Sequence, residues 1–266
     1  MIKNGVTDFF FVDKNRATLA IEGEDKIDFL QALTTNNIEK VSKEGIIYTA
    51  ILSPQGKYLY DFFVFSLGNN EIFIDIHQSR VVALKKFLEF YKLNSDVTIS
   101  DKSCQVVLSS VQEEFFSFPD PRAKILGWRC YDFNEEFVRK TKGYDEFEIN
   151  RIKGLIPETG IELIPEKSYI LELNFEKIHG VDFKKGCYIG QEVTARMKHK
   201  AKLKNKLYCG HIPIDPENKD DKKIYFDGKV VGEIFSIFNN YCLIKIKEDF
   251  KEEKLTVFGQ PLTLVN

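Results

Sequence analysis

Hydrophobic positions along the first hundred residues follow two different spacings. Apolar side chains recur every three or four residues in Glu24–Leu33 and in Arg80–Leu93, which predicts two helices. Short segments rich in β-branched and aromatic residues predict strands. These segments are Arg16–Ile21, Ile46–Leu52, Tyr58–Leu67, Glu71–Ile76, Asp96–Ile99 and Gln105–Leu108. They follow one another too closely for helical crossovers, so we expect an α+β region with antiparallel pairing and not a doubly wound sheet.

The middle of the chain has a weaker pattern. Phe118–Arg122 contains two prolines and predicts a loop, and Gly127–Phe133 predicts a short strand. Apolar residues in Tyr144–Ile152 have helical spacing, and Gly154 can end that helix. Leu155–Ser168 predicts irregular chain, which lines a binding site in some proteins and only packs in others.

Strand spacing dominates after Lys206. The pairs Asp227-Gly228 and Asn239-Asn240 are typical of tight hairpin turns. The predicted strands are Leu207–Ile214, Lys222–Phe226, Lys229–Phe238, Tyr241–Lys247 and Leu255–Val265. This all-β segment predicts a small barrel or sandwich. We therefore expect two parts, residues 1–200 and residues 201–266.

Composition narrows the class of protein. The chain has 266 residues and a net charge of −2, so no overall field draws it to nucleic acid or to a membrane. The start of the chain lacks the pattern of a signal peptide, and no apolar run is long enough to span a membrane. The five cysteines are scattered and form no C-x-x-C pair, so we expect no disulfide framework and no metal site built from this chain alone. These features predict reduced thiols in a cytoplasmic protein.

The stretch Gly180–Glu192 is the most unusual in the chain. Gly186 and Gly190 allow a tight backbone path or the close approach of a ligand. Two adjacent lysines at 184 and 185, together with a helix that begins at Gln191, would favour the thiolate form of Cys187. The alternative is a glycine-containing turn that holds a buried, inert cysteine.

The octapeptide at residues 185–192, K-G-C-Y-I-G-Q-E, resembles the signature of the YgfZ/GcvT family of folate-binding proteins. Val193–His199 and the residues around Tyr144, Arg151 and Pro157 are also similar to that family. Two N-terminal segments, Phe29–Asn37 and Leu52–Asp61, resemble the glycine-cleavage T-protein. The likeness extends from about residue 16 to residue 206, and the octapeptide is its most specific part.

The resemblance implies a fold and a function. The fold would have two intertwined α+β subdomains around a central channel that holds tetrahydrofolate, followed by a small C-terminal β-barrel. The function would be that of a folate-dependent accessory factor, and not of a classical enzyme. It would bind tetrahydrofolate, or a one-carbon or polyglutamylated derivative, and assist client proteins or cluster-assembly machinery in making or repairing iron–sulfur enzymes, including tRNA-modifying ones.

Two other functions remain open. The T-protein-like segments leave room for a folate-dependent aminomethyltransferase or demethylase. A non-catalytic scaffold, in which Cys187 only packs, is the third alternative.

The resemblance assigns roles to particular residues. Cys187 matches the signature cysteine and Asp61 matches a folate-site carboxylate of the T-protein, which makes both candidates for catalysis. Asp61 could equally be a solvated charge on a strand edge, and Arg151 could pair with a ligand carboxylate, pair with a protein carboxylate or be a surface charge. The expected cofactor-binding set is Asp61, Arg151, Lys185, Gly186, Tyr188, Gly190, Gln191, Glu192 and Arg196.

Lysines occupy every second position from Lys198 to Lys206. Such a run suits the anionic tail of a polyglutamylated folate or an RNA phosphate, but it is also typical of a solvated linker. Aromatic residues for base stacking are missing nearby, which does not favour direct binding of nucleic acid.

Overall fold

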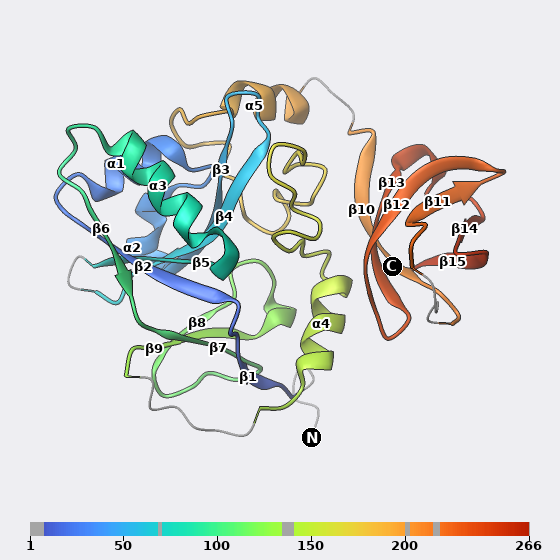
Figure 1. The fold of residues 1–266 in the computed structure, drawn as a ribbon, viewed down its shortest axis with the longest axis horizontal. Coiled ribbons are helices and arrows are strands. Elements are labelled where there is room, and N and C mark those ends of the chain that lie inside the picture. The colour runs from blue at the N-terminus through green and yellow to red at the C-terminus, as the bar shows by residue number, and fades with distance from the viewer. Residues whose placement is uncertain (1–7, 69–70, 135–140, 200–202, 215–218, 266) are drawn as a thin grey trace.

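The structure is a computed structural model that describes residues 8–68, 71–134, 141–199, 203–214 and 219–265. Figure 1 shows a body with two antiparallel sheets and, beside it, a C-terminal barrel. The body and barrel confirm the α+β class expected from the sequence. Within the described residues no helix is both long and apolar enough to cross a membrane.

The larger sheet has five strands in the order β3-β4-β5-β2-β6. Their bounds are Arg16–Glu22 for β2, Ile46–Leu52 for β3, Tyr58–Phe65 for β4, Ile72–His77 for β5 and Thr98–Lys102 for β6. The hairpin between β3 and β4 is confirmed, and every pair in this sheet is antiparallel. Helices α1 (Lys26–Leu33) and α3 (Val81–Lys92) pack their leucines onto one face of the sheet. Short helical segments at Ile38–Lys40, Val41–Glu44 (α2) and Gln78–Arg80 complete this part.

The smaller sheet has the order β1-β7-β9-β8 and lies at the lower end of the body in Figure 1. Its strands are β1 (Phe10–Val12), β7 (Gln105–Ser109), β8 (Phe116–Pro119) and β9 (Trp128–Asp132). The pattern missed β1, which has only three residues, and the predicted loop at Phe118–Arg122 overlaps β8. Pro119 is the last residue of this edge strand, where the missing N–H is tolerated. A 3₁₀ turn at Lys124–Leu126 precedes β9, and α4 (Tyr144–Lys153) follows it.

The C-terminal strands close into a six-stranded barrel. They are β10 (Asn205–His211), β11 (Lys223–Phe226), β12 (Lys229–Phe238), β13 (Tyr241–Lys247), β14 (Leu255–Val257) and β15 (Gln260–Val265). Both predicted tight turns have positive φ angles at their two central residues. A third such turn, at Phe258 and Gly259, divides the single strand expected over Leu255–Val265. A phenylalanine gives no turn signal, which is why the pattern missed this break.

The barrel and the body share one apolar core. Leu207, Cys209 and Leu243 of the barrel pack in the same cluster as Leu173 and Phe175 of the body. The expected boundary at residue 200 lies outside the described residues, between α5 (Gln191–His199) and β10. The division of the chain into residues 1–200 and 201–266 stays a prediction.

A charged layer lies between the two sheets of the body. Asp75 of β5 is fully buried and accepts a hydrogen bond of 2.6 Å from Nε of Arg16 and one of 3.0 Å from the Tyr131 hydroxyl. Arg129 lies 3.5 Å from the same carboxylate and stacks 3.9 Å above the Phe63 ring. Burial alone would raise the pKa of Asp75, but the charges of Arg16 and Arg129 lower it. In this layer the negative charge of Asp75 is balanced by the positive charges of Arg16 and Arg129.

Candidate functional site

Two distant segments meet beneath the signature octapeptide. The hydroxyl of Thr35 donates to the carbonyl oxygen of Gly180 at 2.7 Å, and the Asn36 side chain donates to the carbonyl oxygen of His179 at 2.8 Å. The backbone amide of Asp182 donates to the carbonyl oxygen of Thr35 at 3.0 Å. The turn after α1 therefore holds the chain that leads into the signature, which we call the signature loop (residues 185–190).

Lys185 fixes the start of the signature loop. Its ammonium donates to the carbonyl oxygens of Gln31 at 2.6 Å, Thr34 at 2.5 Å and Asn36 at 3.2 Å. Gln31 and Thr34 belong to the last turn and the C-cap of α1, where the unpaired oxygens and the helix dipole favour a cation, and Asn36 lies two residues beyond the cap. Burial lowers the pKa of Lys185 to about 8. All three ammonium donors are used within the protein, so Lys185 acts here as a clamp.

Gly190 fixes the other end of the loop. Its φ angle is +82°, and a Cβ atom there would lie 2.6 Å from the carbonyl oxygen of Ser53 and 3.2 Å from Cα of Gly56. The glycine is required because the loop packs directly onto the turn of the β3–β4 hairpin. At Gly186 a Cβ atom would meet nothing within 4 Å, so this glycine faces open space.

Cys187 lies between the two clamps and is the one exposed cysteine of the five. The next residue, Tyr188, turns inward and is 7% exposed, and burial raises its pKa to about 12. Its hydroxyl has no hydrogen-bond partner among the described residues. The loop thus alternates between buried anchors and exposed residues, and it presents the thiol to solvent. The expected alternative of a buried cysteine is therefore wrong, and the reactivity of the thiol stays a prediction.

The expected helix begins at Gln191. Glu192 and Arg196 are 84% and 64% exposed, and their side chains form an ion pair of 2.7 Å with each other on the outer face of α5. Surface pairs at this spacing contribute little to stability, and both side chains are open to solvent.

Asp61 lies inside the body, away from solvent. It is 5% exposed and accepts hydrogen bonds from the hydroxyls of Tyr48 at 2.8 Å, Tyr58 at 2.6 Å and Thr159 at 2.5 Å. Burial and the neighbouring Asp61 charge raise the pKa of both tyrosines. Three neutral donors hold this carboxylate, so the alternative of a solvated strand-edge charge is wrong.

Arg151 lies where the body meets the barrel. It is 4% exposed and donates to the Ile156 carbonyl oxygen at 2.9 Å and to the Ser236 hydroxyl of β12 at 2.9 Å. Its guanidinium also lies 3.1 Å from Glu148 and 3.5 Å from Glu162. Burial raises the pKa of both glutamates against the opposing charge of Arg151. Arg151 pairs with carboxylates of the protein, and the alternative of a surface charge is wrong.

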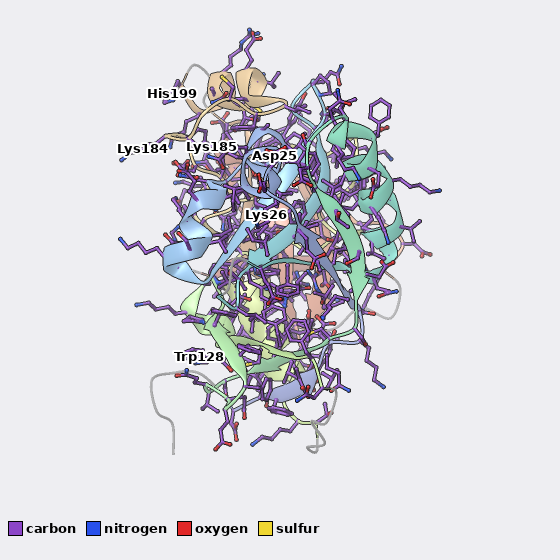
Figure 2. The ribbon with its side chains drawn as sticks, turned by 90° about the vertical axis from the view of Figure 1, so that its left-hand side faces the viewer. Asp25, Lys26, Trp128, Lys184, Lys185 and His199 are labelled. Carbon is purple, nitrogen blue, oxygen red and sulfur yellow. The ribbon has the colours of Figure 1, made fainter. Side chains whose placement is uncertain are left out.

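The residues expected to form one site therefore lie in three places: the exposed signature loop, the interior around Asp61, and the seam around Arg151. Figure 2 shows Lys184 and Lys185 in the upper half of the molecule, far from Trp128. No group of three potential metal ligands is found in the part of the chain that the structure describes. Sequence reasoning missed the clamp at Gln31, Thr34 and Asn36, because no local pattern links these residues to Lys185.

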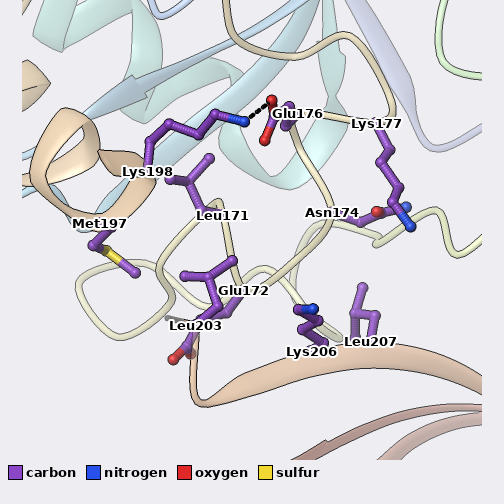
Figure 3. A pocket seen from close by; sticks show the side chains of 10 residues that line it. All are labelled: Leu171, Glu172, Asn174, Glu176, Lys177, Met197, Lys198, Leu203, Lys206 and Leu207. Carbon is purple, nitrogen blue, oxygen red and sulfur yellow. Dashed lines mark hydrogen bonds and ion pairs between the residues drawn. The ribbon is translucent and has the colours of Figure 1, made fainter. Parts of the chain in front are cut away.

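Two of the cavities near the signature segment are lined by residues that precede or follow it. Figure 3 shows a groove of about 330 Å³ between α5, residues 171–177 and the start of β10, with an ion pair between Lys198 and Glu176 at its edge. Lys198 and Lys206 of the lysine run line it, whereas 200–202 lie outside the described residues. The second cavity, of about 340 Å³, is lined by Tyr48, by the charged side chains of Lys40 and Glu44, and by the polar side chains of Asn36 and His179.

Comparison with solved structures defines the class of fold. The chain superposes on the glycine cleavage system aminomethyltransferase T from Bartonella henselae with a TM-score of 0.76, over 98% of this chain and 86% of that one. Only 11% of the residues are identical, so the likeness concerns the fold alone. It confirms the GcvT-like α+β fold with a C-terminal barrel.

Sequence comparison gives more particular relatives, although no family model matches. The chain is 26% identical over 219 residues to the "Iron-sulfur cluster assembly factor IBA57 homolog, mitochondrial" of Mycosarcoma maydis, covering 73% of this chain and 54% of that protein. It is 28% identical over 226 residues to the mouse IBA57 factor, covering 73% and 63%. The chain spans about half the length of the relatives from Mycosarcoma maydis and Coccidioides immitis. Because these relatives are named as mitochondrial, the expected cytoplasmic location is wrong.

Proposed function

We propose that this protein is an accessory factor in the assembly or repair of iron–sulfur proteins and that Cys187 is its point of contact with them. The observation that carries the proposal is the exposed thiol on a loop anchored at both ends. The relatives named as iron–sulfur cluster assembly factors support it. The YgfZ-like octapeptide extends the proposal to clients that include tRNA-modifying enzymes.

The chain's own residues define what the loop can do. One thiolate is a single ligand, and clusters are held by several, so a client or carrier protein would supply the other ligands. Lys185 and Gly190 hold the loop, and the open space beside Gly186 lets a partner approach the sulfur. The thiol proton is released to solvent when Cys187 binds iron as thiolate.

We also propose that tetrahydrofolate, or a one-carbon or polyglutamylated derivative, binds in the cavity beside Tyr48. The expected cofactor-binding residues do not converge on one cavity, and three of them are already paired within the protein. The cavity beside Tyr48 offers groups that suit the ligand: Glu44 can accept from pterin N–H groups, and His179 can donate to a carboxylate. Lys40 lines the same cavity and is paired with Asp182 at 2.8 Å, so it would have to exchange this partner for a ligand carboxylate. Bound folate would supply one-carbon chemistry.

The role in iron–sulfur assembly is tested by deletion and complementation. A strain without this gene should lose activity of iron–sulfur enzymes, and the wild-type gene should restore it. Cys187→Ser should fail to restore it, whereas Cys104→Ser, at a half-buried residue, should succeed. Normal enzyme activities in the deletion strain would exclude the role, and full complementation by Cys187→Ser would favour the scaffold alternative.

Folate binding is tested by thermal unfolding. Ligand at about 100 times its Kd should stabilise the protein by about 2.7 kcal/mol and raise the Tm by several degrees. Glu44→Gln should reduce this shift, and Lys43→Met, on the exposed surface of the same helix, should not. An unchanged Tm with saturating tetrahydrofolate would remove folate from the proposal without touching the role of Cys187.

The fold of an aminomethyltransferase keeps that activity as the second candidate. The three hydroxyl donors around Asp61 already occupy the carboxylate that the T-protein resemblance made catalytic. Formation of methylene-tetrahydrofolate from an aminomethyl donor would decide for this candidate, and its absence at high enzyme concentration would exclude it.

A further inference from the structure

A groove of about 530 Å³ adjoins the signature loop. Its walls come from α1, from the end of α3 and from the signature loop itself. Most of its lining is apolar, from Phe29, Ala32, Leu33, Tyr91 and Ile189. Ile189 follows the exposed Cys187 by two positions. An occupant that contacts Ile189 therefore lies two residues along the chain from Cys187.

Two exposed apolar side chains, Phe90 and Leu93, flank the groove-lining Tyr91 along the chain at the end of α3. Phe90 is 75% exposed and contacts the Tyr91 ring at a centroid distance of 5.3 Å. Leu93 is 84% exposed and has a φ angle of +47°, in the left-handed region that glycine tolerates best. A glycine here would avoid both the backbone strain and the exposed leucine side chain. A leucine in this position is explained if a partner covers it.

The rim of the groove is acidic. Asp25 and Asp28 line it, and the loop that carries Asp25 is tied to Asp96 by a hydrogen bond of 2.8 Å. Glu22 and Glu24 are exposed on the same loop. Lys26 is buried and donates to the carbonyl oxygen of Gly23 at 2.8 Å, so its charge faces inward. Lys92, next to Tyr91 in the last turn of α3, is paired with Glu89 at 3.2 Å. Figure 2 shows Asp25 and Lys185 in the same half of the molecule.

We propose that this groove docks a basic amphipathic helix of a partner protein. The apolar face of the helix would cover Tyr91, Leu93 and Ile189, and its lysine or arginine side chains would face the acidic rim. The inference rests on the proposed function, because it names the surface by which a client or carrier reaches Cys187. The expected occupant is a protein segment, because the acidic rim repels nucleic acid and anionic ligands and the apolar floor suits an apolar helix face.

The test uses a fluorescent helical peptide of about 18 residues, long enough to form a helix, with leucines at positions i, i+3, i+4 and i+7 and lysines elsewhere. We expect it to bind, to bind more weakly as salt increases, and to lose binding when glutamates replace the lysines. Two variants test the groove itself. Asp28→Lys should weaken binding by about tenfold through charge reversal. Ala32→Trp, at an exposed position of α1, should block the groove with its larger side chain.

The matched control is Asp145→Lys, which should leave binding unchanged. Asp145 is exposed in the first turn of α4, just as Asp28 is exposed in the first turn of α1.

Position is tested with the same peptide carrying a terminal bromoacetyl group, which alkylates a nearby thiol with loss of bromide. Cys187 should be labelled faster than by free bromoacetamide, and Ala32→Trp should abolish the difference. Equal binding by wild type, Asp28→Lys and Ala32→Trp would overturn the docking surface. In the deletion strain, full complementation by the Asp28→Lys/Ala32→Trp double variant would overturn it too, while failure of Cys187→Ser there would leave the proposed function standing.

Discussion

The signature loop and the interior of the body use charged residues in opposite ways. In the loop, the buried Lys185 charge is held by backbone carbonyls, and its effect is to present an exposed thiol. In the interior, Asp75 is paired with buried arginines, and no atom of the carboxylate reaches solvent. The difference is that the buried charges of both regions are paired inside the fold, whereas the exposed thiol is the group that a partner can reach.

The largest expected effect tests the interior. Asp75→Asn leaves the Arg16 and Arg129 guanidinium groups buried without their compensating charge, which should lower the free energy of unfolding by about 3–5 kcal/mol. Urea unfolding measures this. Asp101→Asn, which breaks a surface pair with Lys85 at a 74% exposed side chain, should lower it by less than about 1 kcal/mol. If Asp75→Asn and Asp101→Asn lowered the free energy of unfolding equally, the buried charge of Asp75 would matter no more for stability than a surface charge.

The next effect links the two regions. Lys185→Met leaves three carbonyl oxygens without their donor, which should lower the free energy of unfolding by about 1–3 kcal/mol. Because the loop loses one anchor, the alkylation rate of Cys187 by iodoacetamide should also change. Lys184→Met, at the exposed neighbouring position, is the control. A Lys185→Met protein with wild-type stability and thiol reactivity would show that the clamp is not needed.

A smaller effect concerns pH at the seam between body and barrel. The pKa of Glu162 is raised from 4.5 by burial, so the folded protein keeps a proton that the unfolded chain releases. The stabilisation from this protonated Glu162 is fully present below about pH 4.5, and it is lost as the pH rises through the raised pKa of the folded protein. Glu162→Gln should flatten that part of the pH–stability curve, measured by thermal unfolding. Asp145→Asn, at an exposed position, should leave the curve unchanged.

The smallest effect on stability should come from Cys187→Ser. The side chain is exposed, so the free energy of unfolding should change by less than about 0.5 kcal/mol. Function should nevertheless be lost in the complementation assay. A Cys187→Ser protein that is strongly destabilised would blur the distinction between the two regions, because its loss of function would then follow from unfolding.

Helices and strands with a clear hydrophobic spacing or a turn signal in the sequence could be predicted. The leucine spacing predicted α3, and the paired asparagines at 239–240 predicted a barrel hairpin. The break at Phe258 and the short strand at Phe10–Val12 have no such signal and depend on tertiary contacts. For the site, the octapeptide pointed to Cys187. The burial of Asp61 could not be predicted, because the hydroxyl of Thr159 that closes it in belongs to the irregular segment.

The bond between Thr35 and Gly180 joins residues that are 145 positions apart. Contacts of such long range form only after much of the chain has been synthesised and has collapsed, and they are slow to form. The support beneath Cys187 is therefore absent from a nascent or partly folded chain. A partner that recognises the clamped loop would engage only molecules that have finished folding.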